Sequence, residues 1–328
     1  MTEAPAGKPV LAVDLGGTKI VTALITPQGR ILSREYSPTL AEEGVDDVIR
    51  RILTTATTLV KNADLPYSSL SGIAIAAAGA IDTEKGVVTD SPNLPGWHNI
   101  PLKARIEQAT GARTFVLNDA TAAALGEHRF GAGRGVNNLI YLTVSTGIGG
   151  GIIIGGKLYS GATGSAGELG HMTIDLNGPH CPCGNIGCLE MLASGKAIAR
   201  EAQRLIAQGA RTMMLEMAEG DARYVSAQTV ANAAHKGDAV ALSVVNKAAT
   251  YLGVGLVNFV NIFNPEMIIV GGGVGKMGET LLRPARKVVA ERAFQFPASV
   301  VRIVSSELGD NSGLFGAVAF VADADRSL

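Results

Sequence analysis

The sequence predicts an α/β protein organised in two lobes, and three observations carry this prediction. At 328 residues, 47% of them hydrophobic and 17% charged, the chain is long enough to bury a sizeable core and has a globular composition. Short apolar runs with the length of buried strands alternate with segments of helical periodicity. A strand, a glycine-rich turn and a second strand occur near the N-terminus and again in mid-chain, which indicates an internal repeat.

The first copy of this repeat follows a short polar lead. The apolar run at residues 10–14 ends at Gly16 and Gly17, and residues 20–25 resume it. We therefore expect a hairpin with a glycine-rich turn, followed by a third strand over residues 30–37.

The second copy begins with an expected strand at residues 139–144, enters a glycine-rich turn, and continues at residues 152–154. Periodicity, small residues and proline place the remaining elements. We expect a helix over residues 45–62, a strand over 72–78, a proline- and glycine-rich loop over 91–97, a strand over 114–117, a helix from there to about residue 129, a helix over 241–263, strands over 267–270 and 300–304, and a helix over 313–322. No low-complexity linker divides the chain, so we expect the lobes to share interwoven connections.

Charge and composition argue against several classes of protein. Lysine and arginine total 28 against 29 acidic residues, and no basic cluster occurs, so a nucleic-acid partner is not expected. Residues 1–9 lack the layout of a signal peptide, and we expect no apolar run close to the ~18 residues that a membrane helix needs. The expectation is a soluble, cytoplasmic protein without a membrane partner.

The first glycine turn carries the residues of a phosphate site. Backbone N–H groups at Gly16 and Gly17, with the Thr18 hydroxyl and Lys19, suit phosphate oxygens, and Asp14 at the strand end can hold Mg²⁺ through water. The alternative is a tight hairpin turn without a ligand. The pattern is not a Walker A loop, and it is not a dinucleotide fingerprint because the turn leads into a strand.

The repeat of this turn favours a nucleotide over an empty hairpin. Two glycine turns in similar settings would clamp a nucleoside triphosphate from both sides, and glycines after a third strand would receive the adenosine. The residues concerned are Thr146, Gly147, Gly149, Gly150 and Gly151 in the second turn and Gly271, Gly272 and Gly273 after the third strand.

A metal site is expected at His171, Cys181, Cys183 and Cys188. Three thiolates and one imidazole form a tetrahedral structural zinc set, and the three cysteines of the chain all lie within this short stretch. The alternative is a loop of reduced cysteines beside an unrelated histidine. Four protein ligands leave no position for an activated water, so the metal would fix the loop and take no part in the chemistry.

Four polar residues near these motifs are candidates for the sugar pocket and for catalysis. Glu168 and Glu190 flank the predicted metal ligands and suit hydrogen bonds to sugar hydroxyls, although Glu190 would equally suit the start of a helix. Asn118 and Asp119 follow a strand, where Asp119 would accept a hydroxyl proton during phosphoryl transfer. Helix capping is the alternative for this pair, and the two interpretations are compatible.

These motifs, in this order, resemble the ROK family of sugar kinases and repressors over residues 11–322. The run G-E-L-G-H followed by C-P-C-G-N-I-G-C-L-E is specific to that family, whereas D-L-G-G-T-K is shared more widely by the actin-like and hexokinase ATPases. The loop at residues 91–97 further resembles bacterial glucokinases of the ROK family.

The resemblance implies a two-lobed actin-like/hexokinase fold with duplicated, ribonuclease H-like lobes and a cleft between them. Residues 1–118 with 313–328 would form the small lobe, and residues 119–312 the large lobe with the zinc loop. The implied reaction is transfer of the γ-phosphoryl group of Mg-ATP to the 6-hydroxyl of glucose, with Asp119 as general base. A homodimer or homotetramer is also implied.

The resemblance also assigns roles to individual residues. Asn93, Asn118, Asp119, Glu168, His171 and Glu190 would contact the sugar, with one ring nitrogen of His171 on zinc and the other facing a hydroxyl. Asp14, Gly16, Gly17, Thr18, Lys19, Thr146, Gly147, Gly149, Gly150, Gly151, Gly272 and Gly273 would surround Mg-ATP.

Three alternatives stay open. An N-acetylhexosamine kinase or a fructokinase would share the same motifs. A sugar-responsive repressor of the family needs a helix-turn-helix ahead of the first strand, and only nine residues precede Val10 here. A purely structural zinc protein would leave the two glycine turns and the Asn118–Asp119 pair without a purpose.

Overall fold

The computed structural model describes residues 7–326 and contains two five-stranded mixed sheets of the same topology. The first has the strand order β3-β2-β1-β4-β8, and the second has the order β11-β10-β9-β12-β13. In each sheet the first three strands in sequence order form antiparallel pairs. The fourth strand then pairs parallel with the first, and the fifth pairs parallel with the fourth. The internal repeat predicted from the sequence is therefore confirmed as a repeat of whole sheets.

The strands have the following bounds. The first sheet contains β1 (Val10–Leu15), β2 (Lys19–Ile25), β3 (Ile31–Pro38), β4 (Gly72–Ala77) and β8 (Thr114–Asn118). The second contains β9 (Leu139–Val144), β10 (Ile148–Ile154), β11 (Lys157–Leu158), β12 (Met267–Gly271) and β13 (Arg302–Ser305). A small third sheet is formed by β5 (Ala80–Asp82), β6 (Val87–Asp90) and β7 (His98–Ile100).

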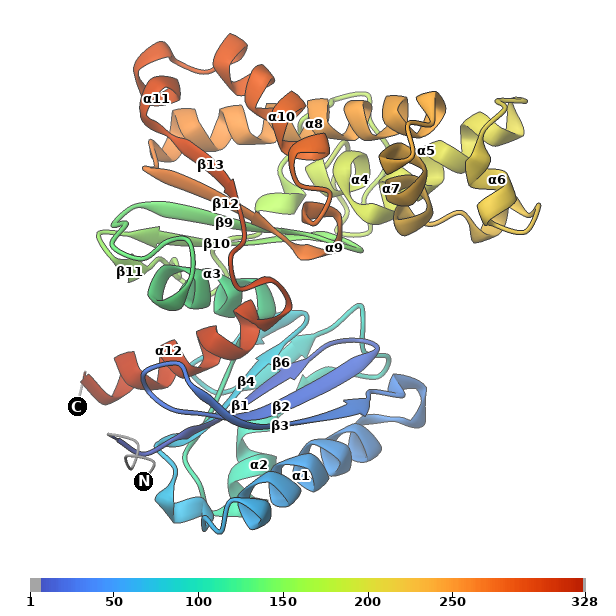
Figure 1. The fold of residues 1–328 in the computed structure, drawn as a ribbon. Helices are drawn as coiled ribbons and strands as arrows, with labels where there is room; N and C mark the ends of the chain where they lie inside the picture. The colour runs from blue at the N-terminus through green and yellow to red at the C-terminus, as the bar shows by residue number, and fades with distance from the viewer. Residues whose placement is uncertain (1–6, 327–328) are drawn as a thin grey trace.

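Helices cover both faces of each five-stranded sheet (Figure 1). α1 (Val45–Asn62) and α2 (Leu102–Thr110) lie on the outer face of the first sheet. α3 (Asp119–Phe130) and α12 (Ser312–Arg326) pack against each other between the two sheets. The outer side of the second sheet carries α4 (Leu189–Ala193), α5 (Gly195–Ala207), α6 (Met213–Met217), α7 (Ala227–His235), α8 (Ala239–Phe263), α9 (Gly272–Gly275), α10 (Glu279–Arg292) and α11 (Gln295–Val300).

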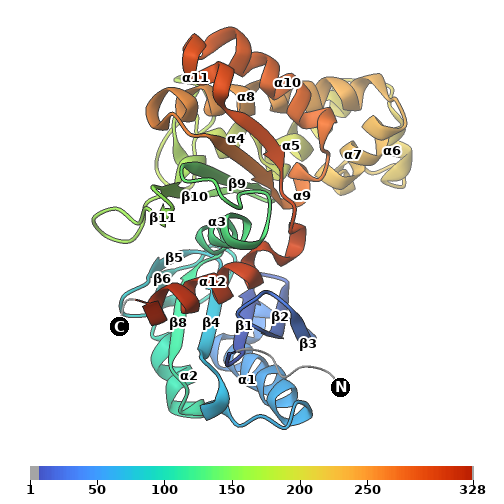
Figure 2. The same cartoon turned by 60° about the vertical axis from the view of Figure 1, so that its left-hand side comes forward.

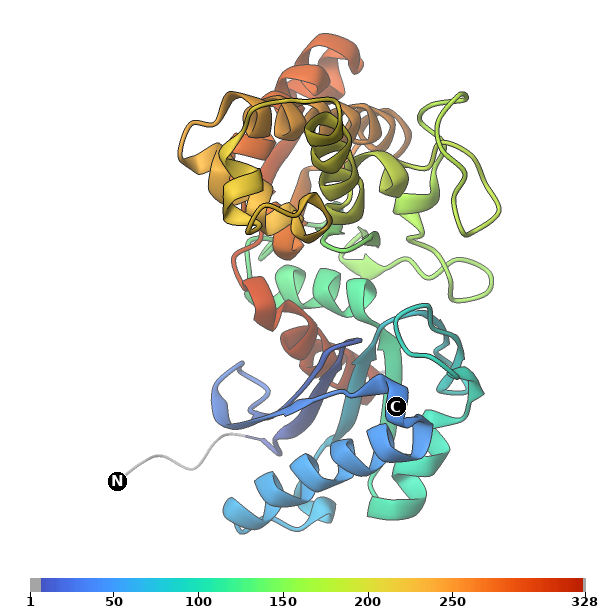
Figure 3. The same ribbon diagram turned by 90° about the vertical axis from the view of Figure 1, so that its right-hand side faces the viewer.

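The two central helices join the halves of the molecule (Figures 2 and 3). α3 packs on β9 and β10 of the second sheet, whereas α12 packs on β1 and β4 of the first. Small residues allow this close contact: a side chain at Gly316 would overlap the carbonyl group of Ala122. The close packing predicted for the small residues of the last helix is thus confirmed, and that helix is longer than expected at both ends.

Most predicted elements agree with the structure within two residues, and α1 and β9 have the predicted bounds. The predicted strand over residues 300–304 is wrong at its start, because Val300 ends α11 and the N–H of Val301 closes a helical turn onto the carbonyl of Pro297. The loop at residues 91–97 contributes to the core, since Leu94 and Trp97 are completely buried there.

The expectation that no segment approaches the requirements of a membrane helix is also wrong. Among the helices described in residues 7–326, α8 has the necessary length, with 25 residues and a mean hydropathy of 1.5 over its most apolar window. More than half of that window, 56%, is buried inside the protein, where α8 packs against α4, α5, α7 and α10. Its apolar composition is accounted for by a position in the middle of a helical layer.

Candidate active site and metal centre

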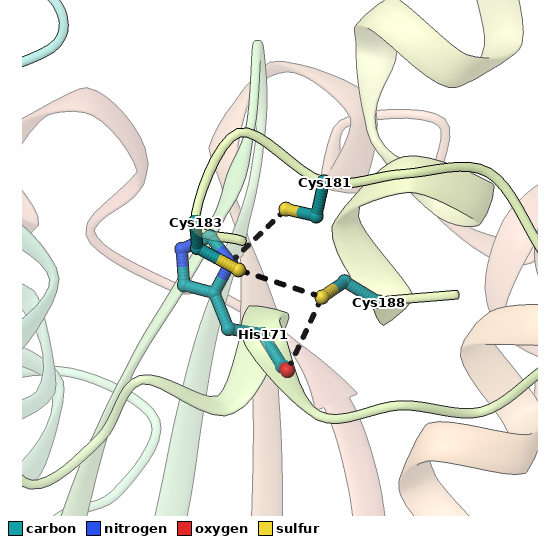
Figure 4. A group of neighbouring side chains, drawn as sticks. All are labelled: His171, Cys181, Cys183 and Cys188. Carbon is teal, nitrogen blue, oxygen red and sulfur yellow. Dashed lines mark hydrogen bonds between the residues drawn. The ribbon is translucent and has the colours of Figure 1, made fainter. Parts of the chain in front are cut away.

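The four predicted metal ligands converge on one point (Figure 4). The donor atoms of His171, Cys181, Cys183 and Cys188 all lie within 4.8 Å of one another. The Cys183 and Cys188 sulfurs are 3.8 Å apart. Thiolates about 2.3 Å from a tetrahedral zinc lie about 3.8 Å from each other, so this spacing fits the metal.

Local backbone structure builds the cluster. The N–H of Gly184 bonds to the carbonyl of Cys181 at 2.9 Å, which closes a turn, and Gly184 adopts a positive φ of 92°. The side chain of Asn185 donates to the carbonyl of His171 at 3.0 Å and to the hydroxyl of Thr173 at 2.9 Å. Asn185 therefore fastens the histidine segment to the cysteine loop, a role that the residue types alone did not reveal.

Burial opposes the ionisation of two of the three thiols. Burial raises the pKa of Cys188 to about 12, and burial also raises the pKa of Cys181. The backbone N–H of Asn185 lowers the pKa of Cys183, the exposed member of the set. Since zinc binds thiolates, the two buried cysteines would lose their protons only as the metal enters.

The two nitrogens of His171 face different groups. Nδ1 lies 3.5 Å from the sulfur of Cys181, so it is the donor that the metal would bind. Nε2 lies 3.8 Å from a carboxylate oxygen of Glu168 on the other side of the ring. The predicted division of labour between the nitrogens is geometrically available, with Nε2 beside one of the candidate sugar ligands.

Glu190 links the metal loop to the second glycine turn. Glu190 lies in the first turn of α4, a helix that begins directly after Cys188, as the helix-start interpretation requires. Its Oε2 accepts a hydrogen bond of 2.8 Å from the N–H of Ile148. A side chain at Gly147 would overlap the same carboxylate, so glycine is needed there for Glu190 to approach.

The segment around Glu168 also rests on β10. A side chain at Gly170 would overlap the carbonyl oxygen of Ile148, and one at Gly150 would lie 2.7 Å from the side chain of Leu169. These glycines let the segment that carries Glu168 and His171 lie directly against the strand.

Gly149, Gly150 and Gly151 do not form a turn as expected. They lie inside β10, and the second turn comprises Ser145, Thr146 and Gly147. A Cβ at Gly149 would be 2.9 Å from that of Ala120, and one at Gly151 would be 2.5 Å from that of Ala124. Because Gly149 and Gly151 have no side chains on this face, α3 can pack directly on the strand. This close packing explains the glycines without any nucleotide.

Asn118 and Asp119 stand where β8 becomes α3. The side-chain oxygen of Asn118 accepts from the N–H groups of Ala120 and Thr121, both at 3.0 Å, and its amide donates to the carbonyl of Gly79 at 3.0 Å. Asp119 accepts from the N–H of Ala120 at 2.8 Å. The predicted capping role of this pair is confirmed.

The charges of four carboxylates are coupled at this point. Burial raises the pKa of Asp119 to about 6, and the charge of Glu168 adds to the effect. Burial raises the pKa of Asp14 to about 7, the charges of Asp119 and Asp310 act in the same direction, and Lys19 opposes them. Buried carboxyl groups with raised pKa values mark candidate sites for proton transfer and for cations.

The first glycine turn lies against the loop that carries Asn93. A Cβ at Gly17 would be 2.8 Å from the carbonyl oxygen of Asn93. The turn is closed by a bond of 3.0 Å from the N–H of Gly16 to the carbonyl of Lys19, and Thr18 is exposed at its tip. Residues far apart in the sequence are therefore brought to one edge of the first sheet.

A cavity of about 360 Å³ opens beside the second turn. Thr146 and Gly273, both predicted as nucleotide contacts, line it. Lys196, Gln228 and Met277 line it too and were missed by sequence reasoning. No periodicity or motif marks these three residues, since α5, α7 and the end of α9 meet here only after folding.

The fold and the site together define the class of two-lobed, hexokinase-like proteins. The ROK family model matches residues 10–324, and the chain belongs to the ROK family.

Individual relatives are similar over nearly the whole chain. The chain is 37% identical to a glucokinase of Thermotoga maritima, over 96% of this chain and 97% of the relative. A ROK family glucokinase from Streptomyces griseus, solved in complex with glucose and AMPPNP, superposes with a TM-score of 0.85 at 34% identity, covering 96% of this chain and 99% of that one. A ROK family transcriptional regulator, a homologue of E. coli Mlc, gives 0.86 at 30% identity, over 97% and 78%.

Proposed function

We propose that the protein is an ATP-dependent glucokinase, which transfers the γ-phosphoryl group of Mg-ATP to the 6-hydroxyl of glucose. One observation carries this proposal. The carboxyl group of Asp119, with a pKa raised to about 6, stands at the start of α3 within the electrostatic influence of both Asp14 and Glu168. The glucokinases among the relatives support the choice of substrate.

Asp119 is the proposed general base. In its ionised form it would orient the sugar hydroxyl and accept its proton as the phosphoryl group arrives. Phosphoryl transfer passes through a loose transition state, so positioning and charge neutralisation supply most of the rate. Asp14 is suited to hold the Mg²⁺ that accompanies ATP and that supplies this neutralising charge.

The sugar pocket is proposed at Asn93, Asn118, Glu168, His171 and Glu190, together with Asp119. Support comes from the metal loop, which carries His171 and holds Glu190 against the second turn. A structural zinc with four protein ligands would keep these groups in place without an open coordination position. Closure of the lobes around the sugar would exclude water as a competing acceptor.

The nucleotide is proposed to lie between the two turns. Asp14, Gly16, Gly17, Thr18 and Lys19 would face the phosphates from the first sheet, and Thr146 and Gly147 from the second. The cavity lined by Thr146, Gly273 and Met277 has space for the adenosine, with Gly272 at the adjacent start of α9. We assign Gly149, Gly150 and Gly151 to packing in support of this site.

The lobe boundaries are proposed to follow the sheets. Residues 1–118 with 313–328 would form the small lobe, and residues 119–312 the large one. The packing of α12 on the first sheet and of α3 on the second supports this division. Residues 1–6 and 327–328 lie outside the described residues.

Self-association and a cytoplasmic location complete the proposal. Ile262, Phe294, Phe296 and Val300 are all at least half exposed near the ends of α8 and α11, an apolar surface suited to contact between copies in a dimer or tetramer. Light scattering at several protein concentrations tests this. Free cysteines and the use of ATP suit the cytoplasm.

A kinetic screen tests the proposed reaction. Glucose, mannose, fructose, N-acetylglucosamine and N-acetylmannosamine are each supplied with Mg-ATP, and glucose is expected to give the highest kcat/KM. A preference for an N-acetylhexosamine or for fructose would assign the alternative kinases. No phosphorylation of any sugar would refute the kinase function, and a regulator of the same fold would then be tested through DNA binding.

A further inference from the structure

Glu127, near the end of α3, is a fully buried carboxylate that the proposed chemistry does not use. A buried carboxylate is tolerated when hydrogen-bond donors surround it. Five donors do so here. Oε1 accepts from Ser306 Oγ at 2.5 Å, Leu308 N at 2.9 Å and Ser312 Oγ at 3.0 Å, and Oε2 accepts from Ala132 N at 3.0 Å and Glu307 N at 3.2 Å.

The origin of these donors is informative. Within residues 7–326 the chain crosses between the two five-stranded sheets twice, first through α3 and then through residues 306–311, which lead from β13 to α12 (Figures 1 and 2). Glu127 belongs to the first crossing. Of its five donors, the four on Ser306, Glu307, Leu308 and Ser312 belong to the second crossing or to the residue that ends it. One side chain therefore ties the two crossings together.

The second crossing leads directly to the proposed phosphate site. Ser312 and Gly313 begin α12, and a Cβ at Gly313 would lie 3.5 Å from the carboxyl carbon of Asp14. Asp310, one turn earlier, forms an ion pair of 2.7 Å with Lys276, which follows α9. The position of residues 306–311 therefore determines how the start of α12 packs against Asp14.

The same hydrogen bonds order the segment internally. Ser306 accepts from the N–H of Gly309 at 3.0 Å while it donates to Glu127. Ser312 shares its one hydroxyl proton between Glu127 Oε1, at 3.0 Å, and the carbonyl of Gly309, at 2.8 Å. A carboxylate that accepts from both serines fixes the two ends of the segment at once.

We propose that Glu127 is a positioning residue for phosphoryl transfer, which fastens the two crossings to each other and so holds the start of α12 against Asp14. The expected effects on turnover and on nucleotide affinity rest on the proposed function, whereas the tether itself does not. A residue that merely stabilised the fold would lower the melting temperature and leave the kinetics of the folded enzyme unchanged.

Glu127→Gln tests the tether with little change of volume. The amide keeps one acceptor oxygen and places an NH₂ group opposite the N–H groups of Ala132 and Glu307. Ser306→Ala removes a single donor as a milder variant. Glu266→Gln is the matched control, because Glu266 also accepts backbone hydrogen bonds, from Asn137 and Asn138. Glu266 lies just before β12, at the end of that strand away from the second crossing.

Three readouts are measured well below each melting temperature: hydrogen exchange of residues 306–312, the affinity for a non-hydrolysable ATP analogue, and kcat with separate KM values for ATP and sugar. For Glu127→Gln we expect exchange about tenfold faster, weaker analogue binding, kcat lower by about 10- to 100-fold and an unchanged KM for sugar. Ser306→Ala should show the same pattern more weakly, and Glu266→Gln none of it.

Two results would overturn the proposal. Unchanged exchange at residues 306–312 would show that Glu127 does not fasten the crossing, and faster exchange with unchanged kcat and analogue affinity would reduce Glu127 to a structural role. If Glu127→Gln does not fold, Ser306→Ala decides by the same criteria. If the wild type phosphorylates no sugar, the kinase proposal fails separately, and exchange with analogue affinity decides the role of Glu127.

Discussion

The two halves of the protein contain the same sheet but use it differently. Asp14 is the fifth of six residues in β1, and Thr143 is the fifth of six in β9, with identical patterns of burial along the two strands. Asp14 pairs with Val21 in the neighbouring strand, whereas Thr143 pairs with Gly149. At these matched positions the first hairpin carries a charged residue opposite a valine, where the second carries an uncharged residue opposite a glycine.

The two copies of the sheet therefore contribute differently to the proposed site: the first supplies carboxyl groups, and the second supplies close packing. The first sheet ends in two half-buried carboxyl groups, Asp14 on β1 and Asp119 directly after β8. In the second half, the glycines of β10 admit α3 and the segment that carries His171, and Glu190 bridges to the metal loop. We expect changes in the first group to alter turnover, and changes in the second to alter sugar binding or stability.

The largest effect is expected for Asp119→Ala. Without a general base, turnover should fall by about 10²- to 10⁴-fold, while calorimetry should show sugar affinity within a few-fold of wild type. Asp82→Ala, which removes a surface carboxylate paired with Lys85, is the control. Near-wild-type turnover of Asp119→Ala would remove the base assignment.

The pH dependence of the wild type tests the same assignment. Asp119 must be ionised to accept a proton, and its pKa is raised to about 6. Asp14 must also be ionised to hold Mg²⁺, and its pKa is raised to about 7. kcat/KM should therefore begin to fall near pH 7 and should fall by at least about tenfold per unit below pH 6. A profile that stays flat down to pH 5 would contradict the assignment.

The comparison between the hairpins is tested most directly by Asp14→Thr, which gives β1 the side chain found at the matching position of β9. Turnover should fall by about 10²-fold because the carboxylate proposed to hold Mg²⁺ is lost. Thr143→Ala should have a much smaller effect. Equal losses in the two variants would show that the hairpins contribute equally.

Loss of the metal should affect binding before catalysis. Cys183→Ser, or a chelator, is expected to raise the dissociation constant for sugar by about tenfold and to lower the melting temperature, because Glu168, His171 and Glu190 lose their support. Turnover at saturating sugar should change less. The metal assignment fails if elemental analysis of the purified protein finds no zinc.

The smallest effect is expected in β10. Gly151→Val places a side chain against Ala124 and should lower the free energy of unfolding by about 1–3 kcal/mol through overpacking, as measured by urea denaturation. Ile154→Val, at the half-exposed end of the same strand, should be close to neutral. A neutral Gly151→Val would mean that the glycines are not required for the approach of α3.

A feature could be predicted from the sequence when the residues that form it lie close together along the chain. The metal ligands lie within 18 positions, and Asn118 and Asp119 act on their own helix, so local patterns were sufficient to find them. Glu127 was missed because four of its five donors lie about 180 residues further along the chain. Lys196, Gln228 and Met277, which line the cavity beside Thr146, were missed for the same reason.

Glycine caused a different kind of error. Gly149, Gly150 and Gly151 were assigned to a turn, because a run of residues without side chains gives the same signal in a turn as in a strand approached closely from both faces. The distinction depends on Ala120, Ala124 and Leu169, which reach β10 only through tertiary packing.

Trp97 gives the protein a built-in optical reporter. It is the single tryptophan of the chain, it is completely buried, and its indole nitrogen finds no hydrogen-bond partner among the described residues. Its fluorescence should therefore be blue-shifted and should shift to the red when its surroundings unfold. Trp97 packs in the core beneath the first sheet and lies only four residues from Asn93. Its emission therefore reports unfolding of that half of the molecule alone, whereas circular dichroism reports unfolding of both halves. Non-coincident melting curves would reveal halves that unfold separately.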